Sequence, residues 1–221
     1  MIKEDSAVRI ARRCAKEFEQ NRLMFINLGV GIPTLIANYL KSDQVFIQTE
    51  NGMLGVGGLA EDQEVDPQLI NAGRQYVKET PGASYFDSAA SFGMIRGNHI
   101  DATVIGAFEV DQQGNIANWI IPNGKQLGVG GAMDLVTGAK RVIVAMRHID
   151  KQGNPKIVKQ LSLPATGFSE VDMIVTDLAV FSFENNRLVL KEIAPEANLA
   201  QIEQVTGAEF VVDDDLKEIV I

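Results

Sequence analysis

The sequence predicts an α/β protein with a mostly parallel sheet and helices on both of its faces. Short apolar runs alternate with segments of helical periodicity, a pattern typical of parallel strands buried on both faces. Polar or glycine-rich boundaries mark where these strands end. We find neither an internal repeat nor a linker-like stretch, so we expect a single domain over residues 1–221. The runs lie at 24–28, 45–48, 102–106, 142–146 and 173–176.

The remaining elements follow from helical periodicity and turn chemistry. Apolar residues recur at helical spacing from Ala7 to Phe18, and Asp5 or Ser6 can cap this opening helix. We expect the other elements in this order: a glycine turn at 29–33, a helix at 34–40, a hairpin of strands 180–183 and 187–190 around residues 184–186, a helix at 199–206 and a strand at 210–212.

Composition limits the class of protein. The 221 residues are 46% hydrophobic and 22% charged, as in an ordinary globular chain that folds without staples. Cys14 is the only cysteine, which excludes an intrachain disulfide and argues against a zinc cluster. The sequence has no signal-peptide pattern and no apolar run of the roughly 18–20 residues that a membrane span needs. We therefore expect a cytoplasmic protein with no membrane partner.

Charge and histidine content limit the ligands. The formal net charge of −9 argues against nucleic acid as a partner, because a negative field repels it. An anionic substrate would have to meet local positive charge or backbone N–H groups. His99 and His148 lie far apart in the sequence and have no metal-ligand spacing, so we expect no metal site.

A carboxylate at the end of the second expected strand is the first candidate for catalysis. Glu50 stands in Thr49-Glu50-Asn51-Gly52, and glycines follow as far as Gly58. Open α/β sheets bind ligands at such strand ends, and glycines let backbone N–H groups approach a ligand. Alone, the pattern is more typical of a helix cap or a turn.

Two further glycine segments could bind a ligand. Gly29-Val30-Gly31-Ile32-Pro33 lies between a strand and a helix, where a turn can present N–H groups to a phosphate or can simply reverse the chain. Gly130-Gly131 leaves main-chain N–H groups unshielded, which suits an oxyanion hole. The alternative for this second segment is a turn that enters a helix.

Together these segments resemble the β subunits of family I coenzyme A transferases, the acetate, acetoacetate and butyrate enzymes that are kin to succinyl-CoA:3-ketoacid transferase. Thr49-Glu50-Asn51-Gly52 is similar to the Ser-Glu-Asn-Gly signature of that family, with threonine for serine. The resemblance extends from the first helix to about Val212. Further matching segments lie at 71–73, 83–88, 95–101, 115–119, 130–135 and 176–181.

The resemblance implies a coenzyme A transferase-like fold, related to that of sugar-phosphate isomerases, and a set of roles. Glu50 is the implied nucleophile, and the backbone N–H of Gly131 is an implied oxyanion donor. Coenzyme A is implied as substrate and covalent intermediate, with no cofactor bound permanently. Its implied contacts are the 29–33 segment and Lys156, and Gly130 is a further candidate contact. Asn51 and Asn118 are secondary candidates, which could bind a ligand or only satisfy the backbone of a turn. The implied partner is a separate α subunit, in an α2β2 or larger hetero-oligomer.

The implied reaction moves coenzyme A from a short-chain acyl-CoA or 3-oxoacyl-CoA to a free carboxylic acid, by a ping-pong path through a glutamyl–CoA thioester. Residues 123–127 and Ala165 depart from the family pattern, which bears on acyl specificity. Two other hypotheses stay open. A sugar-phosphate isomerase of related fold would need basic residues for phosphate and an acid/base pair, and a non-catalytic ligand sensor would not need Glu50.

Overall fold

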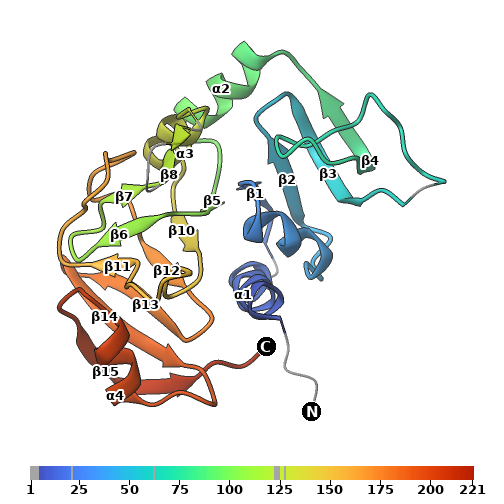
Figure 1. Cartoon of the computed structure of the whole chain (residues 1–221). Coiled ribbons are helices and arrows are strands. Elements are labelled where there is room, and N and C mark those ends of the chain that lie inside the picture. The colour runs from blue at the N-terminus through green and yellow to red at the C-terminus, as the bar shows by residue number, and fades with distance from the viewer. Residues whose placement is uncertain (1–4, 21, 62, 122–124, 127) are drawn as a thin grey trace.

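The computed structural model describes residues 5–20, 22–61, 63–121, 125–126 and 128–221. Within these residues, ten strands form one sheet in the order β15-β14-β13-β12-β10-β5-β1-β2-β3-β4 (Figure 1). The strands are β1 (Met24–Leu28), β2 (Val45–Thr49), β3 (Met53–Leu59), β4 (Val77–Tyr85), β5 (Ala102–Ile105), β10 (Val142–Ala145), β12 (Met173–Val175), β13 (Ala179–Glu184), β14 (Arg187–Ile193) and β15 (Val211–Glu218).

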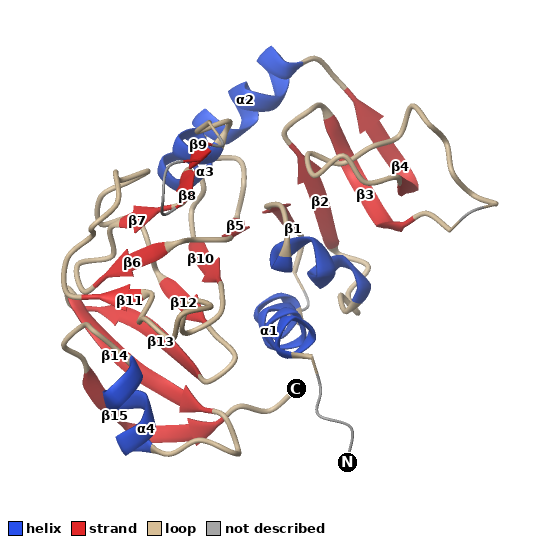
Figure 2. Cartoon of the chain, in the orientation of Figure 1, coloured by secondary structure: helices blue, strands red, loops and turns tan. Residues whose placement is uncertain are grey.

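Helices and two small sheets complete the described chain (Figure 2). The α-helices are α1 (Ser6–Ala15), α2 (Ser88–Arg96), α3 (Ala132–Gly138) and α4 (Leu199–Val205), and the 3-10 helices are η1 (Lys16–Phe18) and η2 (Ile32–Asn38). The small sheets are β11-β6-β7, from β6 (Glu109–Asp111), β7 (Ile116–Ala117) and β11 (Ile157–Val158), and β8-β9, from β8 (Ile120–Ile121) and β9 (Lys125–Gln126).

The centre of the large sheet is parallel, antiparallel pairs flank it on both sides, and the edge strand β15 runs parallel to β14. Strands β2, β1, β5, β10 and β12 run in the same direction, so their carboxyl ends meet at one edge. Hairpin pairs extend the sheet at both ends, through β3 and β4 on one side and β13 and β14 on the other. The prediction of a mostly parallel α/β sheet is confirmed for this centre.

Side chains alternate between two apolar layers on the faces of the sheet. In β10, Ile143 and Ala145 join the layer under α1 and η2, whereas Val142 and Val144 join the opposite layer. The opposite layer includes residues of α3, α4 and the small sheet β11-β6-β7. The expectation of helices on both faces is therefore confirmed, and a small sheet shares the second face with them.

The glycine run after Glu50 is a strand, which corrects the expectation of a glycine turn against a ligand. Gly55, Gly57 and Gly58 lie within β3, which pairs with β2 and β4. A Cβ atom at Gly55 would lie 2.9 Å from Ala83 Cα, and one at Gly57 would lie 3.1 Å from Lys78 O. These two glycines therefore allow the close approach of β4.

Other elements differ from the expectation in type or length. The helix expected at 34–40 is the 3-10 helix η2, which begins two residues earlier with Pro33 in its first turn. The last strand continues to Glu218, beyond the expected end at residue 212, and contains Asp213, Asp214 and Asp215. The opening helix, the strand at 24–28 and the helix near 199–206 are confirmed.

The expected hairpin is confirmed with a clear local cause. Asn185 and Asn186, which join β13 to β14, have φ of 50° and 61°. A two-residue turn with positive φ matches the twist of the strands, and asparagine tolerates that conformation. Of the segment 123–127 that departs from the family pattern, residues 123, 124 and 127 lie outside the described residues. No helix in the described part of the chain is long and apolar enough to cross a membrane.

Candidate active site

Glu50 lies in the tight turn that joins β2 to β3. The turn is closed by the N–H of Gly52, which donates to the carbonyl of Thr49 at 3.0 Å. Gly52 has a φ of +124°, and a Cβ atom there would lie 2.2 Å from Phe86 O, so only glycine fits. The turn therefore holds Glu50 at the carboxyl edge of the parallel strands, as the sequence predicts.

The Thr49 hydroxyl ties this turn to the loop at 70–73. It donates to Asn51 Oδ1 at 2.7 Å and accepts from the backbone N–H of Ala72 at 3.0 Å. Asn51 Nδ2 in turn donates to the carbonyl of Ile70 at 2.9 Å. Both ends of the Asn51 side chain therefore bond within the protein, and threonine keeps the hydroxyl that serine supplies in the family signature.

The Glu50 carboxylate is half-buried and meets a neutral donor. Asn27 Nδ2 donates to Glu50 Oε2 at 3.1 Å. None of the ion pairs between described residues includes Glu50. One carboxylate oxygen is therefore held by an amide, and no counter-ion of the described chain competes for the other.

Gly131 lies against Glu50, although the two residues are far apart in the sequence. Gly131 precedes α3, and a Cβ atom there would lie 3.6 Å from Glu50 Cγ and 2.9 Å from Phe92 Cζ. Phe92 belongs to α2, which with α3 lies at the end of the sheet toward which β2 points (Figure 1). The fold therefore brings together the two groups that the resemblance implies as nucleophile and oxyanion donor. Gly130, next to them, has a φ of +53°.

The segment Gly29-Val30-Gly31-Ile32-Pro33 follows β1 and lines a large open cleft. Gly29 N donates to Val104 O at 2.8 Å, and a Cβ atom at Gly29 would lie 3.2 Å from that oxygen, so β5 passes close by. Gly31 has a φ of +93°, and Val30 is exposed. Val30, Ile32 and Pro33 form one wall of a cleft of about 940 Å³.

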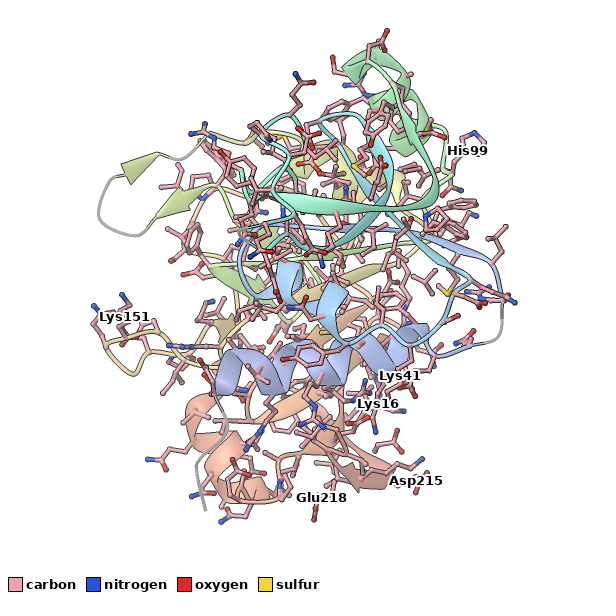
Figure 3. The ribbon with its side chains drawn as sticks, turned by 90° about the vertical axis from the view of Figure 1, so that its right-hand side faces the viewer. Lys16, Lys41, His99, Lys151, Asp215 and Glu218 are labelled. Carbon is pink, nitrogen blue, oxygen red and sulfur yellow. The ribbon has the colours of Figure 1, made fainter. Side chains whose placement is uncertain are left out.

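Lys156 lies on another wall of the same cleft. Its Nζ donates to the carbonyl of Ala107 at 2.6 Å. Burial lowers the pKa of Lys156 to about 8, partly opposed by Asp177 and Asp150. Arg147 and Lys151 also line the cleft, and Figure 3 shows Lys151 at the outer edge of the molecule. Glu109 and Asp150 line the cleft as well, so three basic side chains stand against two acidic ones. This small positive excess, in a chain of net charge −9, favours an anionic ligand.

Glu50 does not line the cleft, but Val30 connects the cleft to the Glu50 turn. Asn27, which bonds Glu50, lies only two residues before Gly29. On the other side, a Cβ atom at Gly73 would lie 3.6 Å from Val30 Cγ1, so the 70–73 loop contacts both the Glu50 turn and Val30. A ligand that reaches from the cleft to Glu50 would thus follow the carboxyl ends of β1 and β2.

Sequence reasoning missed three buried polar residues behind Glu50. Asn27, Gln48 and Ser91 are fully buried, and with Glu50 they form what we call the Glu50 cluster. For Asn27 and Gln48 the available signal was a polar residue after three apolar ones, at the fourth position of the strands MFINL and VFIQT. Parallel pairing places these two residues side by side, which the sequence of either strand alone does not reveal.

The histidines lie away from this site. His148 is fully buried, with both ring nitrogens bonded to the hydroxyls of Thr176 and Thr206 at 2.9 Å. His99 is exposed at the surface (Figure 3). The described residues contain no group of three or more histidine, cysteine, aspartate or glutamate side chains arranged to hold a metal ion.

Comparison with known proteins shows the family to which this fold belongs. The family model described as coenzyme A transferase matches residues 8–204. The chain therefore belongs to the coenzyme A transferase family, and the predicted class of enzyme is confirmed.

Individual relatives agree with this assignment. The chain is 49% identical to a succinyl-CoA:3-ketoacid coenzyme A transferase subunit of Helicobacter pylori, over 92% of this chain and 97% of that protein. It is 48% identical to the beta subunit of the acetate CoA-transferase of Haemophilus influenzae, over 96% and 94%. Among solved structures, an acyl-CoA transferase from Escherichia coli O157:H7 in a thioester complex with CoA has a TM-score of 0.76 at 22% identity. That likeness covers 100% of this chain and 44% of the solved chain, and it shows the fold.

Proposed function

We propose that this chain is the catalytic β subunit of a coenzyme A transferase and that Glu50 carries coenzyme A as a glutamyl thioester. The observation that carries the proposal is the contact between Glu50 and Gly131, with a Cβ position of Gly131 only 3.6 Å from Glu50 Cγ. A nucleophile beside a backbone N–H at a glycine is the pairing that acyl transfer requires.

The proposed reaction has two halves. The free oxygen of Glu50 attacks the thioester carbonyl of the donor, the C–S bond breaks, and an acyl–glutamyl anhydride and coenzyme A thiolate result. The thiolate then attacks the glutamyl carbonyl, the bond to the acyl carboxylate breaks, and the first acid leaves. A second acid reverses both steps, so one difficult exchange becomes several easier ones.

Gly131 supports the proposal because a carboxylate is a weak nucleophile toward a thioester. The site has to stabilise each tetrahedral oxyanion, and one such donor is typically worth about 10²–10³ in rate. A side chain at position 131 would stand between Glu50 and Phe92, so glycine keeps open the space between Glu50 and the backbone that carries the Gly131 N–H. We assign this N–H as an oxyanion donor, with Gly130 next to it.

Coenzyme A is proposed to bind in the cleft beside the 29–33 segment. Lys156, Arg147 and Lys151 supply positive charge there, which suits the phosphates of coenzyme A. The Gly29 N–H already donates to Val104 O, so we assign the pantetheine amides to the backbone N–H groups that follow it in the 29–33 segment. Asn51 is a weaker candidate as a ligand contact, because its side chain already bonds Thr49 and Ile70.

The proposed substrates are short-chain acyl-CoA or 3-oxoacyl-CoA donors and free carboxylic acids. The names of two relatives, at 49% and 48% identity, include succinyl-CoA, a 3-ketoacid and acetate, so overall identity does not choose between them. Both relatives are named as one subunit of an enzyme. We therefore propose an α subunit as partner, in an α2β2 or larger assembly. A cytoplasmic location and a single domain stay predictions of the sequence.

Covalent trapping tests this function. The purified complex with its α subunit is incubated with acyl-CoA in the absence of acceptor acid and then treated with hydroxylamine or borohydride. Mass spectrometry should find a coenzyme A-dependent hydroxamate or alcohol at Glu50, and none in a Glu50→Ala complex. A modification at another residue, or none, would overturn the proposal, as an isomerase or a ligand sensor would show no such adduct.

A further inference from the structure

The floor beneath Glu50 is a row of buried polar side chains. Asn27 of β1 is paired in register with Gln48 of β2 on one side and with Thr103 of β5 on the other. All three side chains are fully buried. Burying a polar group costs about 1–3 kcal/mol unless it is hydrogen-bonded. Packing alone therefore does not explain why polar residues occupy these three buried positions.

Hydrogen bonds run through the row from α2 to Glu50. Gln48 Nε2 donates to Ser91 Oγ of α2 at 2.7 Å. Asn27 Nδ2 donates to Gln48 Oε1 at 2.8 Å and to Glu50 Oε2 at 3.1 Å. Gln48 therefore donates away from Glu50, toward α2, whereas Asn27 donates both to Gln48 and to the Glu50 carboxylate.

The Glu50 carboxylate, which can only accept, fixes the orientation of the Asn27 amide. If the Asn27 amide were turned over, its oxygen would face the Glu50 carboxylate and repel it. Because Gln48 Nε2 is bonded to Ser91, Gln48 Oε1 is left to accept from Asn27, which keeps the Asn27 donor on the side of Glu50. This order leaves a cost, since Asn27 Oδ1 and Thr103 Oγ1 are buried without a partner among the described residues.

We propose that Asn27 is a positioning residue for the nucleophile, held in its orientation by Gln48 and Ser91. The inference rests on the proposed role of Glu50. Asn27 holds one oxygen of the Glu50 carboxylate in place. The other oxygen is then already oriented toward the thioester carbonyl, and the Glu50 side chain need not change rotamer before it attacks. A neutral amide does this without forming the ion pair that would weaken the carboxylate as a nucleophile. The unpaired Asn27 Oδ1 is then a cost in stability that accompanies the function.

The test measures formation of the glutamyl–CoA adduct in a single turnover of the α/β complex. Gln48→Met removes the support of Asn27 without touching Glu50, and we expect the rate of adduct formation to fall about 10- to 100-fold. The KM for acyl-CoA should change little, because the cleft is untouched. Asn27→Asp places a second carboxylate against Glu50, so we expect a loss of about 10²-fold near neutral pH. Part of that loss should be recovered at lower pH, where the two carboxylates share a proton.

Thr103→Val is the matched control in the same buried row. It removes a hydroxyl without a partner, keeps the shape of the side chain and does not contact Glu50, so we expect unchanged activity and equal or higher thermal stability. If Gln48→Met and Asn27→Asp both form the adduct at the wild-type rate, the inference is overturned. It is also overturned if their rates fall only in proportion to the fraction of folded complex. Absence of the adduct from the wild-type complex would instead sink the proposed function.

Discussion

Two clusters of buried polar side chains in this molecule differ in how their hydrogen bonds are satisfied. The His148 cluster, which consists of His148, Thr176 and Thr206, is closed, because each ring nitrogen has a hydroxyl partner at 2.9 Å. The Glu50 cluster is open, because it ends on a half-buried carboxylate and leaves Asn27 Oδ1 with no partner in the described part of the chain. A satisfied network adds stability, whereas an unsatisfied one that faces a cleft or a turn is typical of a functional site.

The comparison assigns stability to one cluster and chemistry to the other. His148 is held between β10, β12 and the end of α4, away from the turn that carries Glu50. Burial lowers the pKa of His148 to about 4, so the ring is neutral near pH 7 and serves as a packed hydrogen-bonding group. Variants of the two clusters should therefore separate catalysis from folding.

The largest effect is expected at Glu50. Glu50→Ala should lower exchange activity by roughly 10³-fold or more, because the covalent path is lost. The free energy of unfolding should change by less than about 0.5 kcal/mol, as Glu50 is half-buried in a turn. Steady-state exchange assays and thermal unfolding of the α/β complex measure both quantities. Glu50→Asp keeps the charge but has a side chain one methylene shorter, so its exchange activity should lie between those of the wild type and Glu50→Ala. Near-normal exchange by Glu50→Ala would contradict the assignment of catalysis to the Glu50 cluster.

A loss of about 10²-fold is expected for Gly131→Ala. The new methyl group would lie 2.9 Å from Phe92 Cζ and 3.6 Å from Glu50 Cγ, so the ring must shift and the nucleophile with it. Gly93→Ala is the control on the same helix as Phe92, since its Cβ meets open space and alanine favours the helix. Measured values of kcat for the two variants should differ by about two orders of magnitude. Equal kcat values would show that Gly131 is needed only for the conformation of the turn and not for catalysis.

Acid should weaken the fold through His148. Its pKa is about 4 in the folded chain and about 6.5 when unfolded, so the unfolded state binds the proton more readily between these values. Stability is therefore fully present above pH 6.5 and falls by up to about 3 kcal/mol as the pH drops toward 4. Urea unfolding across this range should show the loss, and His148→Gln should flatten the curve while exchange at pH 7.5 stays unchanged. A fall in exchange at constant stability would place His148 in the catalytic machinery.

The smallest effect concerns Lys156 and the binding of coenzyme A. With a pKa of about 8, its positive charge is present at pH 7 and is mostly lost at pH 9. We expect the KM for acyl-CoA to rise about tenfold over that range in the wild type and to be high and flat in Lys156→Met. Asp177, Asp150 and Arg147 are the other charged groups that face this amine.

Lys159→Met is the control for that experiment. Lys159 is exposed and pairs with Glu209 at 2.8 Å, away from the cleft lining. Its loss should leave KM unchanged at every pH. If Lys156→Met follows the wild-type pH profile instead, Lys156 is a structural residue that bonds Ala107 and does not contact coenzyme A.

Local patterns in the sequence determined much of the fold. The apolar runs gave β1, β5, β10 and β12 because strands buried on both faces need apolar residues at nearly every position. Turn chemistry at Asn185-Asn186 gave the hairpin of β13 and β14. A family signature on Glu50 and Gly131 pointed to the candidate site, because the covalent chemistry needs a carboxylate and an unshielded N–H.

Only the tertiary structure decided what lies next to what. The sequence did not reveal that Gly55 and Gly57 admit β4, because a glycine in a turn and a glycine under a crossing strand look alike in a linear chain. It also gave no means to join Asn27 to Gln48, Ser91 and Glu50, since these contacts arise from parallel pairing of separated strands and the packing of α2. Long-range neighbours are set by how whole elements pack, and no local propensity encodes them.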